Sequence, residues 1–243
     1  MMAMSQPVPA EAAQPSRRFD ELREILLSPV TIGFLTAITI VGNRLRFSAG
    51  FEPEYGFMVT NLFLAWIPLA LSYAIAWAAR REVTRPALPL LACAWILFLP
   101  NAPYLVTDIV HLHRDEVNVV NAIELTLLAL CGLLIAVKSV QLVQRAVETL
   151  WGVAAGWRAV QAIIVLAALG VYIGRVLRWY SWTLLQHPHQ LEHSLERAAV
   201  QPARVLLGVV GVAVFAGAFY AVYRVLTGPR KDSLAPAGPV TAP

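Results

Sequence analysis

Residues 90–112 have the sequence LLACAWILFLPNAPYLVTDIVHL, in which a long apolar run is interrupted by two prolines. A helix needs about 20 apolar residues to cross the roughly 30 Å hydrocarbon core of a bilayer. Five other stretches of the chain have a similar length and character. Together they predict an all-α, polytopic transmembrane helix bundle of about six spans, at residues 25–42, 57–79, 87–112, 119–140, 159–179 and 203–226.

The composition agrees with a protein that has lipid as its solvent. The 243 residues are 58% hydrophobic and only 14% charged, whereas soluble domains carry about 25% charged residues. No polar stretch is long enough for a separate soluble domain. We expect a cytoplasmic N-terminal tail with a short amphipathic helix at residues 1–24, a transmembrane domain at 25–226, and a disordered cytoplasmic tail at 227–243. The first 24 residues lack the apolar core of a signal peptide, so we expect the first span to be retained.

The distribution of positive charge predicts the orientation in the membrane. With the N-terminus inside, 12 of the 19 Lys and Arg residues fall in cytoplasmic segments, and such an excess is typical of the inner side. We therefore expect a multi-pass protein of the cell (inner) membrane with both termini in the cytoplasm. The basic residues sit at helix ends and form no single stripe, which argues against nucleic acid as a partner.

The third span is predicted to be broken. Pro100 and Pro103 each remove an amide donor and disfavour helical geometry in the preceding residue. The helix should therefore break near Leu99 and restart around Pro103. Unwound backbone at membrane depth requires surrounding protein or a water-filled cavity, so this break is a first indication of a site.

Polar residues follow the break at helical spacing. Asn101, Tyr104, Asp108, His111 and Asp115 are three or four residues apart and share a face of a predicted α-helix, with Leu105, Val106 and Ile109 on the other side. This stripe points either into the bundle or, if the helix lies on the outer leaflet, simply into water.

A second polar cluster closes the fifth span. Arg175 and Arg178 share a helix face and could bind a phosphate or carboxylate through bidentate hydrogen bonds. Trp182 would lie at the interfacial aromatic belt. The alternative is that both arginines extend to lipid headgroups as anchors. Gly170 and Gly174 in this span predict close helix packing.

Two further polar residues support the same end of the bundle. Asn61 lies in the outer part of the second span, and Glu124 lies below the interface in the fourth. A carboxylate at that depth needs a partner or a proton, and we expect Arg175 to be the partner of Glu124. Either Glu124 and Arg175 form a structural ion pair, or Glu124 acts as a catalytic acid.

Metal and cofactor sites are not predicted. His189 and His193 are four residues apart, but Pro188 interrupts them and no clustered carboxylate or cysteine completes a ligand set. The sequence contains no phosphate-binding, dinucleotide-binding or hydrolase motif. Cys93 and Cys131 both fall within predicted spans and are expected to be buried and reduced.

Three stretches resemble a family of bacterial membrane proteins known as domain of unknown function 1361. These stretches are NLFLAWIPLALS (61–72), FLPNAPYLVTDIVHL (98–112) and YIGRVLRWYSWTLL (172–185), and the resemblance covers most of residues 40–225. The resemblance implies a multi-spanning membrane protein without an established activity. It implies family-like polar residues at Asn61, Asn101, Tyr104, Thr107, Asp108, His111, Arg175, Arg178 and Trp182. The opening of the fourth span, VNVVNAIEL, departs from the family pattern and carries no implied role for Glu124.

These observations favour a site that binds an anionic group on the extracytoplasmic side, such as a lipid headgroup or a lipid-linked intermediate. Arg175, Arg178 and Trp182 would hold the anion, Asn101 and Tyr104 would orient it, and Asp108 with His111 could move a proton. An accessory or scaffold subunit that binds a membrane protein partner and no ligand is the first alternative. A small-molecule transporter is the second, since broken helices line transport sites, although no internal repeat is visible. The sequence does not decide whether the protein is an enzyme.

Overall fold

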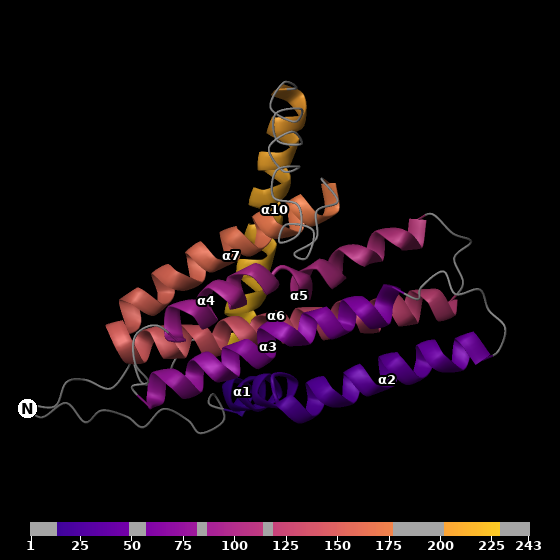
Figure 1. Cartoon of the computed structure of the whole chain (residues 1–243). Coiled ribbons are helices and arrows are strands. Elements are labelled where there is room, and N and C mark those ends of the chain that lie inside the picture. The colour runs from indigo at the N-terminus through magenta and orange to yellow at the C-terminus, as the bar shows by residue number, and fades with distance from the viewer. Residues whose placement is uncertain (1–13, 49–56, 82–86, 114–118, 177–201, 229–243) are drawn as a thin grey trace, which may run out of the picture.

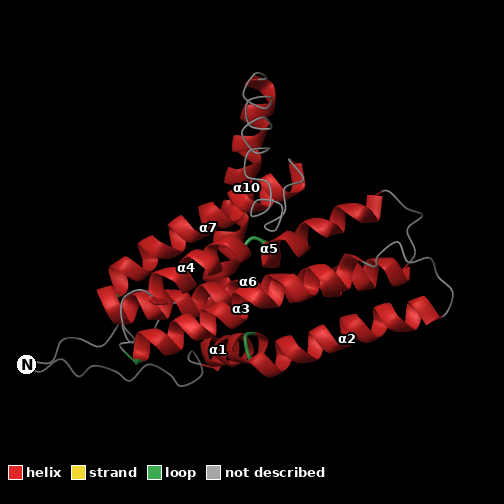
Figure 2. Cartoon of the chain, viewed as in Figure 1, coloured by secondary structure: helices red, strands yellow, loops and turns green. Residues whose placement is uncertain are grey.

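The computed structural model describes residues 14–48, 57–81, 87–113, 119–176 and 202–228, which are helical apart from short turns (Figure 2). In chain order the helices are α1 (Gln14–Leu26), α2 (Pro29–Ser48), α3 (Phe57–Arg80), α4 (Ala87–Phe98), α5 (Asn101–Tyr104), the 3-10 helix η2 (Leu105–His113), α6 (Val119–Trp151), α7 (Val153–Val176) and α10 (Pro202–Thr227). No strand occurs in these ranges. The predicted all-α fold is confirmed.

Five stretches of the described chain are long and apolar enough to cross a membrane. They are Met58–Arg80, Ala87–Ile109, Val119–Trp151, Val153–Arg175 and Val205–Thr227. A sixth span results if α1 and α2, which are bent by 53° at residues 27–28, count together. The protein is therefore a multi-pass helix bundle with about the predicted number of spans.

Helix α6 forms the centre of the bundle. It packs against α2, α3, η2 and α7, and it contributes a large share of the buried core (Figure 1). At about 1.5 Å per residue its 33 residues extend over about 50 Å, well beyond the predicted end at residue 140. Gly152, with φ +85°, then turns the chain directly into α7.

The bend between α1 and α2 has a local cause. Ser28 caps α2 by accepting a hydrogen bond from the Thr31 amide at 3.1 Å, and Pro29 occupies the first helical position that prolines favour. On α1, Arg23 donates from Nε to the carbonyl oxygen of Val225 at 2.7 Å. This contact attaches α1 to the C-terminal end of α10, where the helix dipole favours a cation.

Buried hydrogen bonds join the helices at mid-bundle. Ser139 of α6 accepts from Trp95 Nε1 at 2.8 Å and donates to the carbonyl oxygen of Pro68 at 3.0 Å, which links α4, α6 and α3. Trp66 Nε1 donates to Thr36 Oγ1 at 3.2 Å and links α3 to α2. In lipid, such contacts and close packing hold helices together because apolar surface alone gives no preference for protein over lipid.

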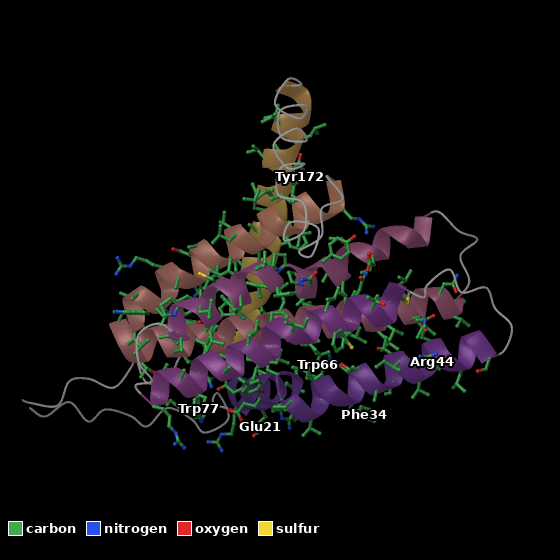
Figure 3. The ribbon with its side chains drawn as sticks, viewed as in Figure 1. Glu21, Phe34, Arg44, Trp66, Trp77 and Tyr172 are labelled. Atoms are coloured by element: carbon green, nitrogen blue, oxygen red, sulfur yellow. The ribbon has the colours of Figure 1, made fainter. Side chains whose placement is uncertain are left out.

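Large apolar side chains project from the outside of the bundle, as a membrane protein requires. Phe34 and Trp77 are examples that point away from the helices in Figure 3. Helix α10 crosses the other helices steeply, and its N-terminal half extends beyond them (Figure 1). Phe219 and Tyr223 in its C-terminal half are buried, and Gly208 in its N-terminal half packs closely against Tyr172 of α7.

Candidate ligand-binding site

The break in the third span lies where the prolines place it. Helix α4 ends at Phe98 and α5 begins at Asn101, with Pro100 at the cap position and in helical geometry (φ −58°, ψ −24°). The predicted break near Leu99 is confirmed, but the restart is two residues earlier than Pro103. Pro103 fits inside α5 because the first amides of a helix have no intrahelical acceptor, so a missing donor there costs little.

Two glycines let the broken segment approach its neighbours closely. A Cβ at Gly132 of α6 would lie only 2.5 Å from the carbonyl oxygen of Ala102 and 2.6 Å from Leu105 Cβ. A Cβ at Gly170 of α7 would collide with the ring of Pro100. The broken segment is therefore held between α6 and α7, and the close packing predicted for Gly170 is observed.

The segment after α5 is a 3-10 helix and not the expected α-helix. Its nine residues exceed the usual three or four, and residues three apart eclipse one another in this geometry. Leu105 and Asp108 consequently share one side, and both are buried, whereas Ile109 is exposed. The prediction that Leu105 lies opposite Asp108 is wrong, because it assumed a period of 3.6 residues.

Arg175, in the last turn of α7, contacts three residues of the broken span. Its Nη1 donates to Asp108 Oδ1 at 3.0 Å and to the Tyr104 hydroxyl at 3.2 Å. Its Nη2 donates to the carbonyl oxygen of Thr107 at 3.2 Å. The guanidinium carbon also lies 5.5 Å from the centre of the Tyr104 ring, within cation–π range.

Burial differs sharply across this ion pair. The side chain of Asp108 is 1% exposed, whereas that of Arg175 is 27% exposed. A carboxylate this deep requires a charged partner, and Arg175 provides it. The arginine in turn keeps part of its surface accessible.

The guanidinium retains unused donors. An arginine carries five N–H groups. Within the described part of the chain, Arg175 donates to Asp108, Tyr104 and Thr107, and Nε and one Nη2 hydrogen have no acceptor there. Nε and Nη2 are adjacent nitrogens on one edge of the plane, which is the arrangement that binds carboxylate or phosphate in a bidentate manner.

Glu124 has a different partner from the one predicted. Its Oε1 accepts a hydrogen bond from Asn43 Nδ2 of α2 at 2.8 Å, and the contacts of Arg175 do not include it. The predicted Glu124–Arg175 pair is therefore wrong. Glu124 lies seven residues from Cys131, which contacts Thr39 of α2 at 3.7 Å, so this face of α6 is directed to α2 and not to α7.

The other predicted site residues are placed only in part. Asn101 donates to the Phe98 carbonyl at 2.9 Å across the break, and Asn61 is half-buried in the first turns of α3. The side chain of His111, and Arg178 and Trp182 entirely, lie outside the described residues. Their proposed roles, and proton transfer between Asp108 and His111, stay predictions.

Sequence reasoning about the site missed the roles of three groups: the Thr107 carbonyl, Gly132 and Asn43. The carbonyl of Thr107 is a backbone acceptor, which no side-chain pattern reveals. Gly132 carries no distinguishing signal within a long apolar run, and Asn43 could have been assigned to Glu124 only with the helix packing known. Within the described ranges no group of three or more His, Cys, Asp or Glu residues could hold a metal ion.

Comparison with known proteins gives a family but no activity. No curated protein and no solved structure matches the chain. Residues 60–217, more than half of the chain, match the family described as "Protein of unknown function (DUF1361)". This range contains the broken span, both glycines and the Asp108–Arg175 pair. The chain therefore belongs to the DUF1361 family.

Proposed function

We propose that this membrane protein binds an anionic group, a lipid headgroup or a lipid-linked intermediate, through Arg175. The observation that carries the proposal is the arrangement of the guanidinium. Asp108, Tyr104 and Thr107 fix three of its N–H groups, and the other two lie on Nε and Nη2 of a side chain that is 27% exposed. A preorganised bidentate donor is well suited to phosphate or carboxylate because little rotamer entropy is lost on binding.

In this proposal Asp108 and Tyr104 position the arginine. Asp108 is buried and already paired, which supports a structural role for its charge in holding the guanidinium plane. Arg178, Trp182 and Asn101 would complete the contacts to the ligand, with Asn61 in a supporting position, whereas Glu124 is bonded to Asn43 of α2. Proton transfer by Asp108 and His111 would be added only if the bound species undergoes a reaction.

The proposed orientation has both termini in the cytoplasm of a bacterial cell and the Arg175 site near the extracytoplasmic face. Four cationic residues support it by their place in the fold. Arg80 ends α3, Arg145 lies in the last two turns of α6, Arg158 lies in the first two turns of α7, and Arg224 lies in the last turn of α10. These helix ends belong to the opposite end of the bundle from Arg175, so positive charge is concentrated there.

The test is retention of an anionic ligand by the purified protein. Native mass spectrometry with lipid extraction compares the wild type with Arg175→Gln, and with Arg44→Gln as the control. Arg44 is an exposed arginine on α2 at the same end of the bundle (Figure 3). We expect Arg175→Gln to weaken retention of one anionic species about 10- to 100-fold, the equivalent of about 1.5–3 kcal/mol for hydrogen bonds to a charged group, and Arg44→Gln to leave it unchanged. Equal, nonspecific lipid in all three proteins would refute the proposal.

A scaffold without a ligand is the second candidate, and one observation favours it. The N-terminal half of α10 exposes Leu206, Leu207, Val209 and Val210 beyond the bundle. The scaffold replaces the first candidate if Arg175→Gln changes no bound species and one membrane protein co-purifies with the wild type and with Arg175→Gln.

A further inference from the structure

Lys138 lies near the mid-depth of the bundle. Its neighbour Ser139 donates to the carbonyl oxygen of Pro68. Pro68 lies at the middle of α3, which extends from Phe57 to Arg80. With a rise of about 1.5 Å per residue, Lys138 is therefore about 17 Å from either end of α3 along the helix axis. An ionisable residue this far from both ends of a span indicates a functional site.

A second cation shares the face of Lys138. Gln141 and Arg145 follow at steps of three and four residues, which places the three side chains along one face of α6. Lys138 and Gln141 are half-buried and Arg145 is exposed, so access increases toward the end of the helix.

Neither cation is neutralised within the described chain. Among the residues that the structure describes, the carboxylates at this end of the bundle are Glu148 on α6, which accepts from Gln144 at 2.8 Å, and Asp20, Glu21 and Glu24 on α1. Asp20 pairs with Arg23 at 3.2 Å. No salt bridge or side-chain hydrogen bond of Lys138 or Arg145 occurs among the described residues.

Helix α1 indicates where the lipid headgroups of this end lie. It exposes Phe19, Leu22 and Ile25 at steps of three residues, an apolar face suited to the membrane interface. Its Arg23 is bonded to the C-terminal end of α10. The headgroup layer therefore lies close to the end of α6 that carries Arg145, and a lysine from mid-depth gains free energy by extending toward it.

We infer that Lys138, Gln141 and Arg145 bind the phosphate of an anionic phospholipid from the leaflet in which α6 ends. Lys138 and Arg145 are seven residues, or about 10.5 Å, apart along α6, and their long side chains can converge on one phosphate. Gln141 between them supplies an amide donor. A carboxylate on a partner helix at the depth of Lys138 would neutralise that residue but leave Arg145 uncompensated, so a phosphate at the interface fits the pair better.

The experiment titrates phosphatidylglycerol and phosphatidylcholine against the delipidated full-length protein, with bound lipid counted by native mass spectrometry. The parent protein and all variants carry Arg175→Gln, so that the first proposed site does not contribute. Failure of one proposal can then be distinguished from failure of the other. A cation that contacts the lipid phosphate at the membrane surface contributes about 1 kcal/mol. We expect Lys138→Gln and Arg145→Gln each to weaken phosphatidylglycerol binding about fivefold and the double variant about 25-fold, with Lys138→Arg close to the parent.

Arg158→Gln is the matched control. It removes an exposed cation at the same end of the bundle, whose Nε donates to its own helix at Ala154, and phosphatidylglycerol binding should not change. Three results would overturn the inference: equal binding of both lipids by the parent, unchanged phosphatidylglycerol binding in the double variant, or equal loss with Arg158→Gln. A protein that co-purifies with the parent and is lost with Lys138→Gln, while lipid binding stays constant, would assign the face to a membrane protein partner.

Discussion

Arg175 combines two properties that usually exclude each other in a membrane. It neutralises a buried carboxylate and donates to Asp108, Tyr104 and Thr107, yet its side chain remains 27% exposed. The side chain of Asp108, which is 1% exposed, has no comparable access to solvent. The cost of breaking the pair should therefore fall mainly on Asp108.

A double-mutant cycle measures this coupling. We expect Arg175→Gln to destabilise the protein by about 1–3 kcal/mol, since it leaves the Asp108 carboxylate buried without its cation. Asp108→Asn should cost less, because the partly exposed Arg175 side chain can be solvated. The double variant should recover part of the loss, with a coupling energy of about 0.5–3 kcal/mol in thermal or denaturant unfolding in detergent. Strictly additive effects would mean that the two side chains contribute independently.

The sequence pattern singled out residues that the structure brings into contact, but it did not predict how they pair. Tyr104, Asp108 and Arg175 were all predicted as site residues, because polar side chains within apolar runs are conspicuous. The partner of Arg175 was predicted to be Glu124 and is Asp108. Which faces of separate helices meet depends on the packing of α2, α6 and η2, and the residue pattern of one helix does not contain that information.

The broken third span depends on glycines in other helices. Gly170 faces the ring of Pro100, whereas Gly211 of α10 has nothing within 4 Å of a Cβ position. We expect Gly170→Ala to destabilise the protein by about 1–3 kcal/mol through overpacking. Gly211→Ala should be neutral or stabilise α10 by up to about 1 kcal/mol, since alanine favours helices. Similar melting temperatures for the two variants would contradict the close contact at Gly170.

The position of the break could be predicted from sequence, and the helix type after it could not. Pro100 and Pro103 act through local backbone sterics, which the residue type determines directly. The 3-10 geometry of η2 is held by tertiary contacts, among them Leu105 against Gly132 and Asp108 against Arg175. These contacts favour a period of three residues. The predicted polar stripe assumed the more common α-helical period of 3.6 residues and therefore put Leu105 on the wrong side.

The bundle as a whole makes a prediction about topology. Ser48 ends α2 and Thr149 lies near the end of α6, both exposed and at opposite ends of the bundle. In a background without Cys93 and Cys131, Ser48→Cys should react with an impermeant thiol reagent in intact cells. Thr149→Cys should react only after permeabilisation, if both termini are cytoplasmic. The reverse pattern would invert the proposed orientation and move the Arg175 site to the cytoplasmic side without changing the fold.

The number of spans was predictable because lipid imposes a length on every apolar run. The extent of α6 was not. Lys138, Gln141, Gln144, Arg145 and Glu148 make residues after 137 resemble the end of a span, but the helix continues to Trp151. It can do so because some of these polar groups are satisfied inside the bundle: the Tyr223 hydroxyl donates to Gln144, and Gln144 donates to Glu148.

The ion pair between Asp108 and Arg175 also constrains the order in which the protein is made. The two residues are 67 positions apart, so Asp108 leaves the ribosome first, by roughly 3–13 s at about 5–20 residues per second. Asp108 lies at the end of the apolar stretch Ala87–Ile109, where an aspartate costs less than the about 2.5–3.5 kcal/mol that it costs at the centre of a membrane helix. Until α7 has been synthesised, the third span lacks the arginine that offsets this cost. The final position of this end of the third span is therefore coupled to a helix two spans later, and a nascent chain that stops before residue 175 should hold residue 108 closer to the membrane surface.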